Sequence, residues 1–455
     1  MFRRILAFFK TGPERPRIED LDLVRRLYER RRASVFLSTV FGYATFYVCR
    51  INFSAAKTSM LDEGVMTATE MGVVGSCLLV GYAIGKAVNG FLADRANVAR
   101  FMSTGLLLSA LLNLGLGLKV PFLLFAVLWG FNGWLQAAGA APCIVSLSQW
   151  FSRRERGSRY GVWCVSHNLG EGITFILTAS LVAELGWRAG FIGPGILSLA
   201  SALVLYHTLA DRPETLGLPP VDIYKNDPVP KEAAVAPVGE LQAKVLRHFG
   251  VWVVGISSAL MYIARYAMNH WGFVWLEKGK AYDTETAGLV LAIYSVTGFI
   301  GSFTSGIISD RFFASRRNEL TLAAGVVEIL SLVALYVIPP GNIWLDAIAM
   351  ALWGYAMGIL VAFLGGLMAV DMVPPRAAGA AAGLVGMVSY VGAAIGDSVS
   401  GRLIDLGRIV GADGSTVYTF EGVFMFWVGA STLSAILALL VWNVGRGLAS
   451  PAPRG

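Results

Sequence analysis

Two arginines stand inside long apolar stretches of the chain, where their side chains could bind an anion. Arg50 lies in YVCRINF, within a segment from 33 to 56 that is otherwise almost free of charge, and Arg265 lies in MYIARYAMNHW. A lone cation near mid-membrane costs about 2.5–3.5 kcal/mol on insertion scales, so it should face a cavity or a partner. Guanidinium groups donate paired hydrogen bonds to phosphate and stay charged. The two arginines therefore predict a phosphate site.

Three interpretations of Arg50 are compatible with its position. The side chain could reach the membrane interface, because the apolar stretch ends only several residues later. It could form a structural ion pair with an acid of another apolar stretch, such as Glu171, Glu328 or Asp397. It could also bind an anionic substrate, which we favour because Arg265 occupies the matching place 215 residues later.

Further polar residues in apolar stretches could support such a site. Lys86 in GYAIGKAVNG would be a second cation of the cavity or a member of an ion pair, and we favour the cavity. His167 in WCVSHNLGEG could equally bond substrate or be a satisfied core histidine. Tyrosine hydroxyls could line the pore, although each ring alone could as well be packing; these are Tyr43, Tyr47, Tyr82, Tyr262 and Tyr390.

The composition predicts an all-α integral membrane protein. Of 455 residues only 15% are charged and the mean hydropathy is +0.62, whereas soluble domains carry about 25% charged residues. We expect twelve transmembrane helices, each near the length that crosses a bilayer. Their expected ranges are 34–57, 71–93, 101–118, 121–148, 160–184, 189–210, 251–276, 286–309, 320–338, 343–370, 379–404 and 422–444. The four cysteines lie in apolar stretches and predict no disulfide framework.

Charge and punctuation divide the chain into two six-helix halves. Basic residues concentrate before the first span and after spans 2, 4, 8 and 10, so the positive-inside rule places both termini in the cytoplasm. The net charge of +7 belongs mainly to loops and does not indicate nucleic-acid binding. The expected parts are a basic cytoplasmic segment (1–33), an N-terminal half (34–210), a Pro-rich cytoplasmic linker (211–250), a C-terminal half (251–444) and a cytoplasmic tail (445–455).

A GxxxDR motif occurs once in each half. It resembles the signature of the major facilitator superfamily, and its two copies lie 216 residues apart, nearly the spacing of the two arginines. This agreement predicts two pseudo-symmetric halves. The glycine would allow close helix approach and the acid would engage loop arginines, so we predict a gating role. The predicted gating residues are Gly90, Asp94, Arg95 and Arg100 in one half and Gly306, Asp310 and Arg311 in the other.

Motifs typical of enzymes are missing from the sequence. There is no phosphate-binding loop of the Walker type, no clustered His and Cys pattern for a metal, and no nucleophile constellation. We therefore expect neither enzymatic activity nor a cofactor or metal. Transport driven by a gradient is the remaining expectation.

The chain resembles the organophosphate:inorganic phosphate antiporter family of the major facilitator superfamily over nearly its whole length. The motifs that carry the resemblance are GYATFYVCRINF, GYAIGKAVNGFLADRAN, FNGWLQAAGAAPC, WFSRRERG, VWCVSHNLGEG, DRPETLGLPP, MYIARYAMNHW and VPPRAAGAAAGLVGMVSYVG. The resemblance implies that Arg50 and Arg265 clamp the phosphate, with Lys86 and His167 in support and Tyr47, Tyr82, Tyr262 and Tyr390 around it. It also implies exchange of phosphate for a phosphorylated metabolite by alternating access.

Five departures from the family pattern spare the two arginines. Ile51 replaces a lysine common in relatives, His270 replaces an acid, Ser295 stands where Glu is frequent, and Glu171 stands where glycine is usual. The tenth span reads GYAMGILVAFLGG and has no aromatic-Gly-Pro run. These changes leave the organic substrate open.

Three functions compete at this level. The first is an inner-membrane antiporter, expected to be monomeric, that exchanges inorganic phosphate for a sugar phosphate, glycerol 3-phosphate or phosphoglycerate. The second is a membrane sensor of hexose phosphate that signals to a histidine kinase. The third is a proton-coupled organic anion symporter, suggested by Glu171, Glu328 and Asp397.

Overall fold

The computed structural model describes residues 8–93, 96–118, 120–226, 243–313, 317–373, 378–410 and 416–441. Long helices dominate, with one small antiparallel hairpin of β1 (Arg408–Val410) and β2 (Thr416–Tyr418). Within the described residues, eleven helices or joined helices are long and apolar enough to cross a membrane. The stretch predicted as the fifth span lies on a further helix, α8 (Arg153–Leu185). All twelve predicted spans are thus helical, which confirms the all-α membrane fold.

The chain divides into two compact units. Unit 1 comprises residues up to Glu63 and Cys77–Glu232, and unit 2 comprises Gly64–Ser76 and the residues from Ala233 on. Helix α4 (Ala68–Ala93) begins in unit 2 and continues in unit 1.

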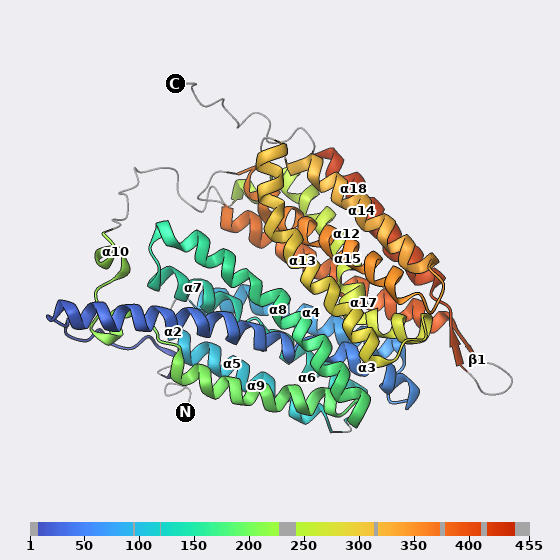
Figure 1. Ribbon diagram of the computed structural model, residues 1–455, viewed down its shortest axis with the longest axis horizontal. Helices are drawn as coiled ribbons and strands as arrows, with labels where there is room; N and C mark the ends of the chain where they lie inside the picture. The colour runs from blue at the N-terminus through green and yellow to red at the C-terminus, as the bar shows by residue number, and fades with distance from the viewer. Residues whose placement is uncertain are drawn as a thin grey trace. The chain divides into compact units, whose positions relative to one another are not determined.

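Unit 1 is built from helices packed side by side, and Figure 1 shows α2, α5 and α9 running together. Pairs separated widely in sequence, such as α5 with α9 and α2 with α8, form its interior. Its elements are α2 (Leu21–Val48), α3 (Asn52–Asp62), α5 (Val98–Leu116), α6 (Phe122–Gln136), α7 (Ala140–Trp150), α8, α9 (Ala189–Thr208), η1 (Pro213–Leu216) and α10 (Val221–Tyr224).

Unit 2 repeats this kind of packing. Helix α12 packs on α17 and α18, and α13 packs on α15; the neighbouring α14 and α18 are visible together in Figure 1. Its elements are α12 (Phe249–Val274), η2 (Trp275–Gly279), α13 (Thr284–Phe312), α14 (Arg317–Val337), α15 (Ile343–Ala362), η3 (Phe363–Leu367), α16 (Met368–Val370), α17 (Ala378–Leu406) and α18 (Glu421–Leu440).

Several predicted spans differ in detail from the observed helices. The first expected span, 34–57, is interrupted between α2 and α3, and α2 already begins at Leu21 within the predicted basic segment. The fourth is likewise two helices, α6 and α7. Interruption inside a membrane helix frees backbone groups that side chains must satisfy.

Glycines bring two helix pairs into close contact. A Cβ added at Gly81 or Gly133 would lie 2.0 Å from a backbone oxygen of the partner helix in the α4–α6 pair, and one added at Gly301 or Gly358 would lie 2.1 Å from such an oxygen in the α13–α15 pair. The close approach expected at Gly306 is not observed, because a Cβ there would meet no atom within 4 Å. The close packing of α13 on α15 occurs at Gly301, further from the C-terminal end of α13 than the motif glycine.

The first part of the predicted linker is docked on unit 1. Gly217 adopts a φ of +76°, which favours glycine, and a Cβ there would lie 2.7 Å from the Pro16 carbonyl oxygen. The ring of Tyr224 stacks on Tyr28 with 3.8 Å between centroids. The linker up to Tyr224 is therefore part of the folded unit 1.

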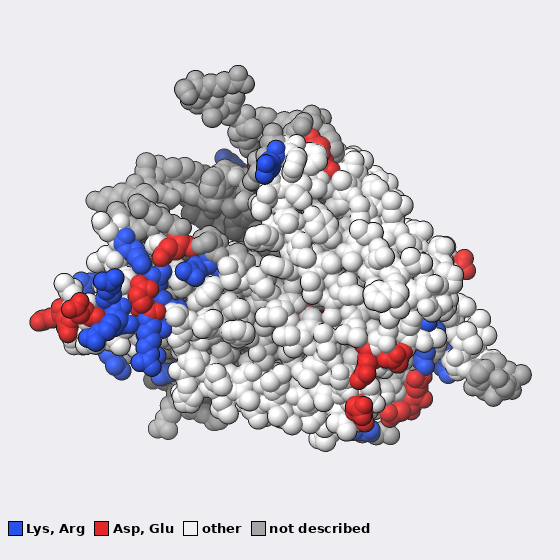
Figure 2. Space-filling view, viewed as in Figure 1, with Lys and Arg blue, Asp and Glu red and all other residues white. Residues whose placement is uncertain are grey.

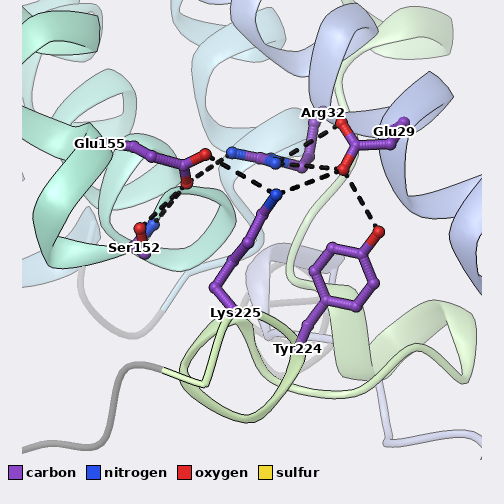
Figure 3. A network of polar contacts seen from close by, with 6 residues as sticks. All are labelled: Glu29, Arg32, Ser152, Glu155, Tyr224 and Lys225. Atoms are coloured by element: carbon purple, nitrogen blue, oxygen red, sulfur yellow. Dashed lines mark hydrogen bonds and ion pairs between the residues drawn. The ribbon is translucent and has the colours of Figure 1, made fainter.

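A network of charged groups holds this docked segment (Figure 3). Arg32 donates to Glu155 at 2.7 Å, and Lys225 of the linker lies 3.7 Å from Glu155 and 3.5 Å from Glu29. The Tyr224 hydroxyl donates to Glu29 at 3.2 Å. The pKa of Glu155 is lowered to about 2; burial raises it, but hydrogen bonds from Arg32 and Ser152 lower it further.

Positive charge on the surface is concentrated where α2 begins. Figure 2 shows Lys and Arg side chains gathered at the left of the view, while most of the remaining face carries uncharged residues. The exposed arginines of the first turns of α2 are Arg25, Arg26, Arg30 and Arg31. Exposed Leu, Ile, Val and Phe side chains on most of the long helices fit contact with lipid.

Candidate functional site

Arg50 lies at the interruption of the first predicted span. Helix α2 ends at Val48, α3 begins at Asn52, and the amides of Arg50 and Ile51 both donate to the Tyr47 carbonyl, at 3.0 and 3.2 Å. The arginine is therefore carried on a turn rather than on a regular helix.

Buried amide side chains satisfy the backbone oxygen that the interruption frees. The Cys49 carbonyl, adjacent to Arg50, accepts from Asn132 Nδ2 at 2.7 Å and from Asn113 Nδ2 at 3.2 Å. Asn52 in turn donates to Asn113 Oδ1 at 2.9 Å and to the Gly190 carbonyl at 2.8 Å. An unsatisfied carbonyl in this environment would be costly, so these asparagines stabilise the turn.

Two more polar residues extend the network. Ser109 donates to Asn132 Oδ1 at 2.6 Å, and Gln136 donates to the Ser109 hydroxyl at 2.8 Å. All five side chains belong to fully buried residues. The sequence analysis missed this group, because single amides in apolar spans have no motif; their recurrence on α5 and α6 was the available signal.

The guanidinium of Arg50 packs on aromatic rings. Its carbon lies 3.7 Å from the Tyr47 ring centroid and 5.1 Å from that of Tyr82, and the residue is only 5% exposed. The Lys86 ammonium lies 5.8 Å from the same Tyr82 ring, and the Lys86 side chain is exposed. The desolvated cation–π contacts of the buried Arg50 contribute about 2 kcal/mol.

His167 joins the same aromatic cluster. Its ring centroid lies 4.8 Å from Tyr43, 5.9 Å from Tyr47 and 5.0 Å from Trp163. Its Nδ1 is 3.0 Å from the Cys164 carbonyl; because a carbonyl only accepts, Nδ1 is the donor of this bond. The structure thus brings Arg50, Tyr47, Tyr82, Lys86 and His167 together within unit 1.

The corresponding site of unit 2 is built on the uninterrupted helix α12. Arg265 is half-buried and donates to the Tyr262 hydroxyl at 3.4 Å. The Tyr390 ring lies 5.6 Å from Tyr262 and 6.0 Å from Tyr266. Tyr262 thus contacts both Arg265 and Tyr390, and their role in a substrate site stays a prediction.

Only some of the predicted gating residues can be placed. Asp94 and Arg95 lie outside the described residues, as does the side chain of Asp310, whereas Gly90 and Gly306 are helical positions of α4 and α13. Arg100 donates to the Phe8 carbonyl at 2.9 Å, and Arg311 is exposed at the end of α13. Their gating role stays a prediction.

The acids named as alternatives to a substrate lie in buried surroundings. Glu328 accepts from Ser431 at 2.7 Å, and Asp397 accepts from Trp271 Nε1 at 2.6 Å and lies 2.8 Å from His270 Nδ1. Glu171 is 1% exposed on α8. Glu328 and Asp397 thus have hydrogen-bond partners inside unit 2.

One buried ion pair of unit 2 was not foreseen. Lys280 lies 3.0 Å from Asp346, and the two side chains are 1% and 0% exposed. Tyr282 donates to the same carboxylate at 2.6 Å, and the Lys280 ammonium also donates to the Ile338 carbonyl. Burial, and then the neighbouring Asp346, raise the pKa of Tyr282. This pair joins the end of η2 to α15 and contacts none of the predicted site residues described above.

Comparison with known proteins agrees with this architecture. Residues 35–397 match the Major Facilitator Superfamily, and the chain belongs to that superfamily. A bacterial homologue of the human lysosomal transporter Spinster, solved in an inward-facing state, has the same fold, with a TM-score of 0.74 at 15% identity over 93% of this chain and 99% of that one.

Relatives of similar length narrow the assignment. The chain is 31% identical to the glycerol-3-phosphate transporter of Bacillus subtilis, over 97% of this chain and 99% of the relative. It is 30% identical to a probable hexose phosphate transport protein of Chlamydia pneumoniae (96% of each chain) and to the membrane sensor protein UhpC of Salmonella typhimurium (96% and 98%). The resemblance to the organophosphate transporter family predicted from the motifs is confirmed.

Proposed function

We propose that this chain is a secondary transporter that exchanges inorganic phosphate for a phosphorylated metabolite by alternating access. The observation that carries the proposal is Arg50, a buried guanidinium held on a membrane-embedded turn. Placing a guanidinium within the membrane costs free energy, and the binding of an anion would offset that cost. No covalent step is needed for this function, so we infer that the chain is not an enzyme.

The proposed phosphate ligands are the two predicted arginines and the polar residues near each of them. Arg50 and Arg265 would each donate to phosphate oxygens, since a guanidinium fork matches them in geometry. In unit 1 the contacts of Tyr82 with both Arg50 and Lys86 support an additional cation near the anion. His167 would add a hydrogen bond, and the hydroxyls of Tyr47, Tyr262 and Tyr390 would complete the surroundings.

The class of organic substrate is taken from the relatives. Their names include a hexose phosphate, glycerol 3-phosphate and phosphoglycerate, which all carry a phosphate monoester. We propose a substrate from this class and leave the organic group open, because Ile51, Glu171, His270 and Ser295 depart from the family pattern around the two arginines.

The proposed membrane arrangement follows the charge distribution. The basic first turns of α2 favour a cytoplasmic N-terminus by the positive-inside rule, and the linker and C-terminus would lie on the same side. Bacterial relatives favour the inner membrane. We propose a monomer that works without a cofactor. We also propose gating by the two GxxxDR motifs.

A second candidate is a membrane sensor of hexose phosphate that acts with a histidine kinase. The specific observation in its favour is the 30% identity to a membrane sensor protein, the same level as to the transporters. A sensor would need the same phosphate site and would not need to move substrate.

Uptake of labelled inorganic phosphate into proteoliposomes, with unlabelled organophosphates as competitors, tests the proposal. We expect saturable uptake that one of hexose 6-phosphate, glycerol 3-phosphate or phosphoglycerate inhibits at the lowest concentration. Binding of organophosphate to the purified protein with no uptake would favour the sensor. The absence of both uptake and binding would refute both functions.

A further inference from the structure

A buried histidine–carboxylate pair lies in unit 2 and has no part in the site proposed above. His270 Nδ1 of α12 is 2.8 Å from Asp397 Oδ2 of α17, with side chains 7% and 0% exposed. Trp271 Nε1 donates to the other carboxylate oxygen at 2.6 Å. With Asp397 accepting through both oxygens, Nδ1 of the imidazole donates and Nε2 is the nitrogen that can gain or lose a proton.

The first turns of α4 cover this pair closely. A Cβ added at Gly75 would lie 1.6 Å from Asp397 Oδ2 and 3.2 Å from His270 Nδ1, and one at Gly72 would lie 2.7 Å from the Asp397 carbonyl oxygen. Ser76 donates to the Ala394 carbonyl at 2.6 Å, one turn from Asp397. The pair is therefore enclosed by α12, α17 and a stretch of α4 that belongs to the same unit.

Several other ionisable groups lie on the same stretches of these three helices. The Tyr266 ring is 5.1 Å from the His270 ring, and Asp405 of α17 caps α4 by accepting from the Thr69 amide at 2.6 Å. The others on these stretches are Tyr262 and Arg265 of α12, Tyr390 and the exposed Arg402 of α17, and Glu70 in the first turn of α4.

Arg265 lies near the same aromatic ring as His270. Its guanidinium carbon lies 5.9 Å from the Tyr266 centroid, on the helix that also carries His270. Two charges separated by roughly 10 Å in a protein of effective dielectric constant about 20 change each other's binding equilibria by about tenfold. A change in the charge of the pair is therefore felt by an anion bound at Arg265.

We propose that His270 and Asp397 form a proton-binding site that takes up one proton when the anion binds. Without the proton the pair carries a net charge of −1, from the carboxylate and a neutral imidazole. With a proton on Nε2 the pair is an imidazolium–carboxylate of net charge zero, which no longer opposes the anion. The proton comes from water, and because coupling is reciprocal, anion binding favours protonation as much as protonation favours the anion.

This inference rests on the proposed function and makes that function proton-linked. Histidine suits the role, because an imidazole can donate from Nδ1 to a carboxylate and bind a proton on Nε2. An Asp paired with Asn or Gln can keep the hydrogen bond but cannot bind the proton on an imidazole. Substitution of His270 by Gln therefore distinguishes a proton-binding role of the pair from a purely structural one.

Calorimetry of inorganic phosphate binding, in buffers of different ionisation enthalpy between pH 6 and 8, tests the proposal. His270→Gln keeps a donor for Asp397 but cannot take up the proton. We expect the wild type to take up more protons on binding phosphate than His270→Gln does. As the pH rises from 6 to 8, the phosphate affinity of the wild type should fall by about tenfold more than that of His270→Gln. Phosphate's own ionisation is common to both proteins. His207→Gln, at the exposed end of α9, is the matched control and should behave as the wild type.

Identical proton uptake and pH profiles in the wild type and His270→Gln would overturn the inference. If His270→Gln does not fold, Asp397→Asn makes the same comparison, because it retains an acceptor for Trp271 and removes the charge; an unchanged pH profile there would also overturn it. A wild type that binds neither phosphate nor an organophosphate at any pH would instead refute the proposed function.

Discussion

The two arginine sites, one in each unit, are supported in different ways. In unit 1 Arg50 sits on a turn between α2 and α3, with its backbone neighbour Cys49 held by the amides of Asn132 and Asn113. In unit 2 Arg265 projects from the uninterrupted α12 and is half-buried. The two halves thus share the arginine and the tyrosine three residues before it, but the local structure around the arginine differs.

The difference has consequences for how firmly each cation is held. A guanidinium 3.7 Å from a ring and 5% exposed is desolvated and confined, whereas that of Arg265 lies 5.4 Å from the nearest ring centroid and retains more exposure. Preorganised, desolvated cations bind anions more strongly. We therefore expect the unit 1 site to supply most of the phosphate affinity and the unit 2 site to adjust it.

The largest expected effect is that of Arg50→Lys. An ammonium cannot reproduce the bidentate fork or its stacking on Tyr47, and loss of a charge-assisted bond costs about 1.5–3 kcal/mol. Phosphate affinity should fall about a hundredfold while the purified protein remains folded, as measured by equilibrium binding and by thermal unfolding in detergent. Binding near that of the wild type would refute the role of Arg50.

Arg265→Lys should have a smaller effect of the same kind. Because Arg265 is half-buried, a lysine there retains part of the electrostatic attraction, and we expect roughly a tenfold loss of phosphate affinity. Measuring both variants under identical conditions tests the comparison directly. A loss at Arg265 equal to or greater than that at Arg50 would show that burial is not what separates the two sites.

Asn132→Ala tests whether the amide network positions Arg50. The change removes the 2.7 Å bond to the Cys49 carbonyl and leaves Ser109 without its acceptor, at a cost of about 1–3 kcal/mol in the free energy of unfolding. We expect phosphate affinity to fall about fivefold as the turn relaxes.

Ser257→Ala is the matched control, since it also removes a buried hydrogen bond, 2.9 Å to the Ser434 carbonyl, from the helix that carries Arg265. It should lower stability and leave phosphate affinity unchanged. Equal affinities for the two variants would mean that the network stabilises unit 1 without positioning the arginine.

Glu155→Gln changes a charged region that lies outside both sites and should affect stability only. The pKa of Glu155 is about 2 in the folded protein, below its ordinary value of 4.5, so its contribution is present above pH 4.5 and is lost as the pH falls towards 2. The side chain is 31% exposed, which limits the contribution to about 0.2–1 kcal/mol. Thermal unfolding between pH 6 and 3 should show a shallower pH dependence in Glu155→Gln, with unchanged phosphate binding at pH 7. An identical pH dependence in both proteins would contradict the assignment.

The sequence predicted the helices and the cations well, because both depend on local composition. Apolar stretches located all twelve helical regions, and the two arginines stood out by their cost in such surroundings. The interruption at 49–51 was not predicted, because CRINF contains no Pro or Gly to signal it. The turn depends instead on Asn113 and Asn132, which come from α5 and α6, and such partners are established only in the fold. The docking of the linker through Tyr224 and Lys225 was missed for the same reason.

Exchange itself is tested most directly by the uptake of labelled phosphate into proteoliposomes that contain either unlabelled phosphate or buffer alone. The account predicts rapid uptake only with phosphate inside, and loss of that uptake in Arg50→Lys. Equal uptake into both kinds of vesicle would contradict obligatory exchange, and exchange that persists in Arg50→Lys would contradict the central role of the buried arginine.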